Sequence, residues 1–132
     1  MATITKFEDL DVWKKARELA TRVYSITSKG KFARDYRFRD QINAAAGSVM
    51  DNIAEGFDRG GRNEFVNFLG FSKGSAGEVK SQLYRALDNE YISKETFDDL
   101  YKLADDIGKL NGGLITYLNK STVKGTKYKE RV

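Results

Sequence analysis

Apolar residues recur every three or four positions through four long stretches of this chain, and short polar breaks separate the stretches. In the first stretch, Leu10, Trp13, Ala16, Leu19 and Val23 follow this spacing. Because an α-helix makes one turn every 3.6 residues, the spacing places the apolar side chains on one face of each helix. The chain contains no proline, so no residue blocks a helix outright.

The spacing predicts four helices, at about residues 10–28, 35–58, 63–89 and 94–120. Asp9 is the expected N-cap of the first helix and Gly30 its expected stop, while Ser93 can cap the fourth. The breaks are short, so sequential helices should lie antiparallel. The predicted fold class is therefore all-α, an up-down-up-down antiparallel four-helix bundle over residues 1–121. A basic tail, expected to be flexible, follows over residues 122–132.

The amino-acid composition argues against most kinds of catalytic site. The 132 residues include no histidine, the commonest general base and a frequent metal ligand, and no cysteine to act as a nucleophile. We therefore expect no metal, no cofactor and no small-molecule substrate. No apolar run is long enough for a membrane span, and the N-terminus lacks the pattern of a signal peptide. The cytoplasm is the expected location.

The segment Gly70–Gly74 reads Gly-Phe-Ser-Lys-Gly, which matches the G-x-S-x-G motif of a serine nucleophile. It lies inside a helical pattern, without the strand that precedes such a serine and without a histidine partner. Glu55 and Glu78 are the nearest candidate acid–base groups, but no second chemical group converges with them. The sequence therefore predicts a protein that is not an enzyme.

Small residues gather in two places, at Ala44–Ser48 and around Gly70–Gly77. Glycine costs about 1 kcal/mol in a helix interior relative to alanine, so its recurrence indicates sites where another helix approaches closely. That helix could belong to the same bundle or to a neighbouring subunit. The candidate helix-packing or oligomer face comprises Ala45, Gly47, Ser48, Gly70, Gly74 and Gly77.

Charge is unevenly distributed along the chain. The net charge of +4 belongs to residues 119–132, and residues 1–118 are neutral. Within that neutral part, residues 29–39 carry a net +4 and residues 88–106 a net −5. These patches could attract each other within a chain or between subunits, or form a solvated mixed surface. At the other end lie the candidate nucleic-acid-binding residues Arg59, Arg62, Lys120, Lys124, Lys127, Lys129 and Arg131.

Three phrases carry a resemblance to a known family: FEDLDVWKKARELATRVYSIT (Phe7–Thr27), QINAAAGSVMDNIAEGFDR (Gln41–Arg59) and FLGFSKGSAGEVKSQLYRALDNEYI (Phe68–Ile92). Over residues 7–118 the chain resembles the four-helix-bundle proteins encoded in intervening sequences of bacterial 23S rRNA genes. More distantly, it resembles the accessory protein of diversity-generating retroelements, a basic pentamer that binds a reverse transcriptase and nucleic acid. The resemblance implies a left-handed bundle that assembles into a homopentameric ring.

The chain departs from the family pattern at two points. Asn43 and Ala44 stand where family members often carry a basic pair, which weakens an RNA-binding role for the second helix. Met50 stands where the family usually has proline, which should leave that helix straighter. The resemblance assigns no proven binding residue.

The sequence therefore predicts a non-enzymatic, ring-forming assembly or interaction protein of the 23S rRNA intervening-sequence type, whose precise role is unknown. The alternative is an RNA- or DNA-binding accessory factor that uses the basic end and tail. Further copies of the same chain are the expected partner, and nucleic acid is the second candidate partner.

Overall fold

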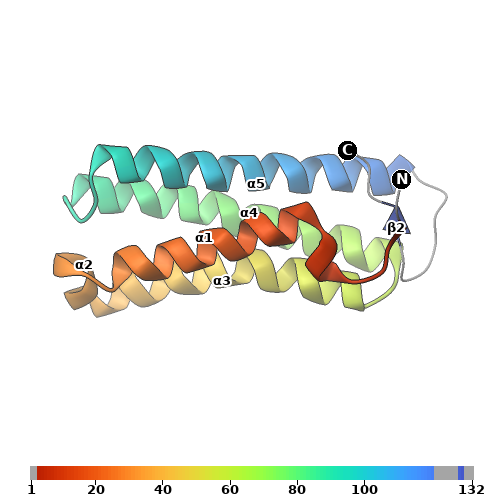
Figure 1. Ribbon diagram of the computed structural model, residues 1–132, viewed down its shortest axis with the longest axis horizontal. Helices are drawn as coiled ribbons and strands as arrows, with labels where there is room; N and C mark the ends of the chain where they lie inside the picture. Colours follow the sequence, from red (N-terminus) through yellow and green to blue (C-terminus); the bar gives the residue numbers. More distant parts are fainter. Residues whose placement is uncertain (1–2, 121–127, 130–132) are drawn as a thin grey trace.

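The apolar stripes build four long helices in the computed structural model, which describes residues 3–120 and 128–129. These helices are α1 (Asp11–Thr27), α3 (Tyr36–Asp58), α4 (Arg62–Asp88) and α5 (Lys94–Lys120). They lie side by side as a bundle, with α1 and α3 along one side and α4 and α5 along the other (Figure 1). The described chain is all-α except for one pair of two-residue strands.

The first helix begins and ends differently from the sequence prediction. Asp9 is not its N-cap, because Phe7–Asp9 form a 3-10 turn, η1, and Leu10 takes the cap position without a side-chain hydrogen bond. Gly30 does not stop the helix either. α1 ends at Thr27, and Gly30, with a φ of 58°, begins a short additional helix, α2 (Gly30–Arg34). Five residues are too few to show a helical period, so the sequence pattern could not reveal α2.

Polar side chains cap the starts of α3 and α5. An Asp35 carboxylate oxygen accepts a hydrogen bond from the Phe38 backbone N–H at 3.3 Å. The Ser93 hydroxyl oxygen accepts one from the Thr96 backbone N–H at 3.1 Å, as the sequence suggested for this serine. Both contacts satisfy N–H groups that the first turn of a helix leaves without a partner inside the helix.

The core of the bundle takes apolar side chains from every long helix. Its fully buried members include Leu19 of α1, Val49 of α3, Leu83 of α4 and Ile107 of α5. Fully burying such a side chain stabilises the fold by roughly 1.5–3 kcal/mol relative to leaving it exposed. α5 also contacts α1, which closes the bundle around this core.

α3 and α4 approach each other closely at Gly56. A Cβ atom on this residue would lie 2.5 Å from Cβ of Phe68 and 3.3 Å from a ring carbon of Phe65. Real Cβ atoms do not approach other atoms so closely, so only glycine fits. Gly56 therefore permits the close contact between α3 and α4.

A hydrogen-bonded polar layer crosses the core. The Ser72 hydroxyl donates to the backbone carbonyl of Val49 at 2.7 Å and accepts from the Asn111 amide at 3.0 Å. Both side chains are fully buried, so the layer links α3, α4 and α5 without reaching solvent. The serine of the G-x-S-x-G motif therefore has a packing role in this fold.

One short strand pair lies at the end of the bundle where α5 finishes (Figure 1). β1 (Thr3–Ile4) pairs antiparallel with β2 (Tyr128–Lys129), Thr3 opposite Lys129 and Ile4 opposite Tyr128. Two residues cannot display the alternation that marks a strand in sequence, which explains why no strand was predicted.

Candidate interaction surfaces

The glycines of α4 face outward. Gly70, Gly74 and Gly77 are exposed, and a Cβ atom on any of them would meet no described atom within 4 Å. Gly47 is also open in this sense, and Ser48 is half-buried, whereas Ala45 is buried in the core. The candidate face of six small residues is therefore divided between the bundle interior and its surface.

A groove of about 280 Å³ runs between α4 and α5 on the outside of the bundle. Small residues form much of its lining, namely Ala76, Gly77, Ala104, Gly108 and Gly112. Lys80 donates to Asp105 across the groove at 2.9 Å, and Lys109 lies 3.1 Å from the same carboxylate. The hydrogen bond to Asp105 raises the pKa of Lys80, and the hydrogen bonds from Lys80 and then Lys109 lower the pKa of Asp105. The groove thus combines a surface of small residues, from which few side chains protrude, with one charged link between the helices.

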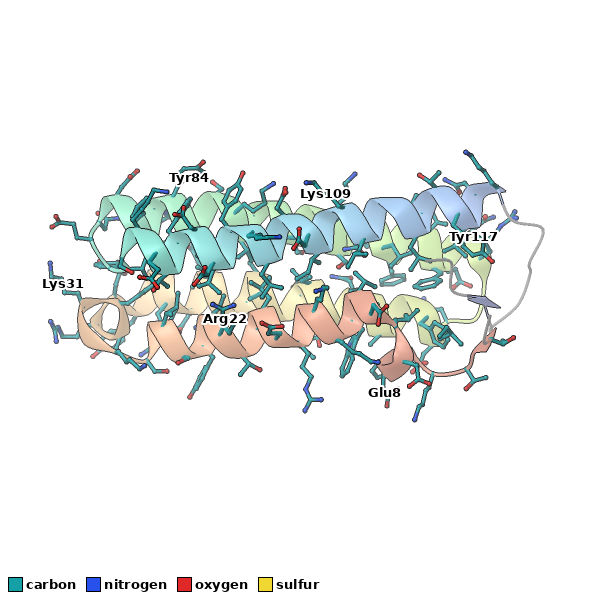
Figure 2. All side chains as sticks on the ribbon, turned by 45° about the horizontal axis from the view of Figure 1, so that its top comes forward. Glu8, Arg22, Lys31, Tyr84, Lys109 and Tyr117 are labelled. Atoms are coloured by element: carbon teal, nitrogen blue, oxygen red, sulfur yellow. The ribbon has the colours of Figure 1, made fainter. Side chains whose placement is uncertain are left out.

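The ring of Tyr84 continues this surface toward the α4–α5 turn, beside the buried Phe97 and the half-buried Tyr101. Tyr84 lies 4.8 Å from Phe97 and 5.7 Å from Tyr101, measured between ring centroids. Tyr84 is 52% exposed and points away from the bundle (Figure 2). We call the surface formed by Gly70, Gly77, Tyr84, Gly108 and Gly112 the α4–α5 face.

A second cavity, of about 520 Å³, lies on the other side of the bundle among α1, α2 and α3. We call it the Asn43 cavity; it is lined by Tyr24, Thr27, Ser28, Ala33, Arg39, Asp40 and Asn43. Asn43 donates to the Thr27 hydroxyl at 2.8 Å and to the Arg39 carbonyl at 2.9 Å, which ties α3 to α1. Both donors of the amide group are thereby used, so Asn43 retains its acceptor oxygen for further contacts.

The basic and acidic segments lie at the same end of the bundle. They adjoin around a cavity of about 350 Å³ that Lys29, Lys31 and Glu90 help to line. In the described part of the chain no ion pair joins the two segments. The nearby pairs are local instead: Arg39 with Asp40, Lys94 with Asp98, and Lys102 with Asp106.

A tyrosine connects the two halves of the bundle at that end. The Tyr91 hydroxyl donates to Asp35 at 2.8 Å, and its ring lies 5.0 Å from that of Phe32. The hydrogen bond to Asp35, followed by desolvation, raises the pKa of Tyr91 above its ordinary value of 10.0. The carboxylate that caps α3 therefore also anchors the α4–α5 turn.

Only part of the candidate nucleic-acid-binding set can be placed. Arg59 donates to Glu55 at 2.8 Å and lies 3.9 Å from Glu64, so two carboxylates share its charge. Arg62 begins α4, and Lys120 ends α5 with an exposed side chain. Lys124, Lys127 and Arg131 lie outside the described residues, and Lys129 is placed only through the backbone of β2.

The described residues hold no group of three or more His, Cys, Asp or Glu side chains that could bind a metal ion. None of the described helices combines the length and apolar character that crossing a membrane requires. Glu55 pairs with Arg59, and Glu78 accepts a hydrogen bond from Gln82 at 3.3 Å. Neither glutamate meets a second group suited to acid–base chemistry in these contacts.

A family model described as "23S rRNA-intervening sequence protein" matches residues 8–113 of the chain. The chain belongs to this family. It is also similar to a solved structure from Bacteroides thetaiotaomicron VPI-5482, described as a protein with unknown function from the S23 ribosomal protein family. The two chains share 25% identity with a TM-score of 0.73 over 79% of this chain and 97% of the other. No curated protein matched the chain. The family resemblance drawn from the three sequence phrases is thus confirmed.

Two features of this family member escaped the sequence reasoning. Tyr84 follows Gly77 by seven residues, so helical geometry alone puts both on one outward stripe. This seven-residue spacing is the signal in the sequence that predicts the shared stripe. The Asn43 cavity had no such signal, because α1, α2 and α3 form it together and α2 was not predicted.

Proposed function

We propose that this member of the 23S rRNA-intervening sequence family is a non-enzymatic assembly protein whose copies join into a closed ring. The number of copies implied by the resemblance is five. Each protomer in this proposal is a left-handed, up-down-up-down antiparallel four-helix bundle, and its expected location is the cytoplasm.

The outward glycines of α4 are the observation that carries this proposal. Each costs about 1 kcal/mol of helix stability relative to alanine. Gly70, Gly74 and Gly77 gain no contact with another described helix of the same chain in return. A surface without side chains is useful where a second molecule must approach the helix backbone. We therefore expect contacts between protomers to offset the helix-propensity cost of these glycines.

The neighbouring residues on the α4–α5 face suit a protein interface. Stable interfaces have an apolar, aromatic centre and a polar rim. Here Tyr84 provides exposed aromatic area, the glycines provide a surface without protruding side chains, and Lys80 with Asp105 provides charge.

Light scattering on the purified full chain tests the proposal directly. The wild-type mass should be a multiple of 14.9 kDa, and five copies are expected. Gly77→Leu should reduce this mass, because its side chain would stand in the interface while leucine remains a good helix former. Gly113→Leu is the matched control, since Gly113 is also exposed, helical and open but lies outside the named face. A strictly monomeric wild type would rule the proposal out.

Nucleic-acid binding at the end of the bundle is a second candidate function. The observation that favours it is the β1–β2 pair, which brings residues 128–129 of the basic tail back to the N-terminal strand. Arg62 and Lys120 belong to the candidate set at that end, as does Arg59, which also pairs with Glu55 and Glu64. RNA binding that weakens steeply with added salt would support this function.

A further inference from the structure

Tyr84 is an exposed aromatic side chain on a surface otherwise formed by small residues. It projects from α4 beside Gly77 and Ser81, and more than half of its surface is open to solvent. An exposed aromatic ring with a polar tip is a typical anchor of a protein interface, because it buries a large area with few rotatable bonds.

The Asn43 cavity offers a matching depression. Its volume of about 520 Å³ accommodates an aromatic side chain, and the ring of Tyr24 borders it. The acceptor oxygen of Asn43, the Asp40 carboxylate and the Ser28 hydroxyl oxygen can each accept a hydrogen bond from a phenol. The cavity is therefore chemically suited to a tyrosine.

Tyr84 and the Asn43 cavity cannot meet within one chain. Tyr84 points outward on the side formed by α4 and α5 (Figure 2), whereas the cavity is lined by residues of α1, α2 and α3, which lie along the other side (Figure 1). Both are nevertheless close to the same end of the bundle. Tyr84 is four residues before the end of α4, and Tyr24 is three residues before the end of α1.

A ring provides the arrangement in which they do meet. Each protomer of a closed ring presents two different surfaces to its two neighbours. When the bundle axes lie along the ring axis, groups on opposite sides and at the same level come together. Tyr84 and the Asn43 cavity satisfy both conditions.

Charge around the two features is complementary. Lys31 and Arg34 of α2 are exposed and lie within two residues of Ala33, which lines the cavity. Asp88 and Glu95 are also exposed, four residues after Tyr84 and two residues before Phe97, whose ring contacts Tyr84. None of these four residues has an ion-pair partner among the residues that the structure describes. Opposite charges at the edge of an interface steer its association and fix its register.

We propose that Tyr84 of one copy enters the Asn43 cavity of the next, with the acidic α4–α5 turn facing the basic α2 of that neighbour. This inference rests on the proposed ring and specifies which surfaces form it. The occupant of the cavity is thus a second copy of this chain.

Paired aromatic variants test the anchor. Tyr84→Ala should weaken self-association at least about tenfold, as expected for an interface hot spot. Phe71→Ala is the matched control, because Phe71 is also exposed on α4, at 58%, but lies outside the α4–α5 face. Circular dichroism should show both variants folded. Equal association of Tyr84→Ala and wild type would overturn the inference and leave the ring itself standing.

Thiol cross-linking tests the contact itself, since the chain has no natural cysteine. A variant with both Tyr84→Cys and Asp40→Cys, treated with a short bifunctional maleimide, should give a ladder of covalent oligomers up to the full ring. Each single variant should remain uncross-linked. A ring without a ladder would overturn this contact alone, and a strict monomer would overturn the proposed function as well. Self-cross-linking of Tyr84→Cys would also overturn it, because that result indicates a two-fold interface.

Charge reversal tests the surrounding patches. Lys31→Glu with Arg34→Glu should weaken assembly through like-charge repulsion against the acidic turn. Adding Asp88→Lys and Glu95→Lys to the same chain should restore it. Unchanged assembly in the first variant, or no recovery in the second, would contradict the proposed pairing of the two patches.

Discussion

At the scale of single residues, two glycines of the same helical hairpin have opposite surroundings. Gly56 of α3 lies against Phe68 and Phe65 of α4, while Gly77 of α4 lies open. Both are helical glycines, and nothing in the sequence distinguishes their surroundings. The difference arises from the neighbouring helix, so substitutions at the two positions should have opposite effects on the protomer.

Gly56→Ala should destabilise the protein. The added methyl group would overlap Cβ of Phe68, and overpacking of this kind costs about 1–3 kcal/mol. That cost should exceed the roughly 1 kcal/mol that alanine gains in helix propensity. Gly113→Ala, where the methyl group meets no described atom, should be stabilising by up to about 1 kcal/mol. Urea unfolding of both variants checks this, and equal stability changes would contradict the packing argument.

The Tyr91–Asp35 hydrogen bond should make part of the stability sensitive to alkali. Because the folded pKa of Tyr91 is raised, its contribution is fully present below pH 10.0 and is lost as the pH rises through the folded value. The difference in unfolding free energy between wild type and Tyr91→Phe should therefore be constant below pH 10.0 and shrink as the pH rises above it. Tyr36→Phe is the control, since Tyr36 is largely exposed and does not line the Asn43 cavity. A difference that does not change with pH would contradict this role.

At the scale of helices, the Ser72–Asn111 layer joins three elements through buried polar groups. The amide oxygen of Asn111 has no hydrogen-bond partner among the described residues, and the side chain is fully buried. An unsatisfied buried polar group costs about 1–3 kcal/mol, so this layer stabilises the fold less than an apolar layer would. Its benefit is in specifying which helix positions face one another, as a buried asparagine does in coiled coils.

A double-mutant cycle measures this effect. Ser72→Ala should destabilise the protein by about 1–3 kcal/mol, because it leaves the Asn111 amide without its partner. Adding Asn111→Leu should recover most of the loss, since both polar groups are then replaced by apolar ones. Thermal unfolding of Ser72→Ala, Asn111→Leu and the double variant gives the coupling free energy between the two side chains. Strictly additive effects would show that the two side chains do not act together.

At the scale of the whole molecule, the two ends and the two sides of the bundle differ. One end joins the basic and acidic segments through Tyr91 and Asp35, and the other gathers Arg62, Lys120 and the β1–β2 pair. Tyr84 is exposed on the α4–α5 side, and the α1–α3 side contains the Asn43 cavity. Such asymmetry suits a ring, in which unlike surfaces meet.

If the end with Arg62 and Lys120 binds RNA, affinity should fall steeply between about 50 and 200 mM salt. Arg62→Gln with Lys120→Gln should lower both the affinity and the steepness of that fall, since each lost phosphate contact reduces the slope by about 0.7–0.9. Lys29→Gln with Arg37→Gln is the control, because it removes the same charge at the opposite end. Fluorescence anisotropy against salt measures both quantities. An equal effect of the two variants would exclude a site at this end, and no binding at low salt would exclude this function.

The sequence by itself determined the four long helices and the family. Apolar spacing is a local property, and residues such as Leu19, Val49 and Ile107 lie on the inward stripe for any bundle partner. The family phrases are local as well. α2 and the two strands escaped because so few residues establish no period.

Only the tertiary structure decided what each helix surface meets. It placed Gly56 against Phe68, left Gly77 open and engaged Arg59 with Glu55 and Glu64. It also put Tyr84 and the Asn43 cavity on opposite sides at one end of the bundle. The physical reason is that helical periodicity fixes which residues share a stripe, whereas the partner of a stripe depends on how residues far apart in sequence pack together.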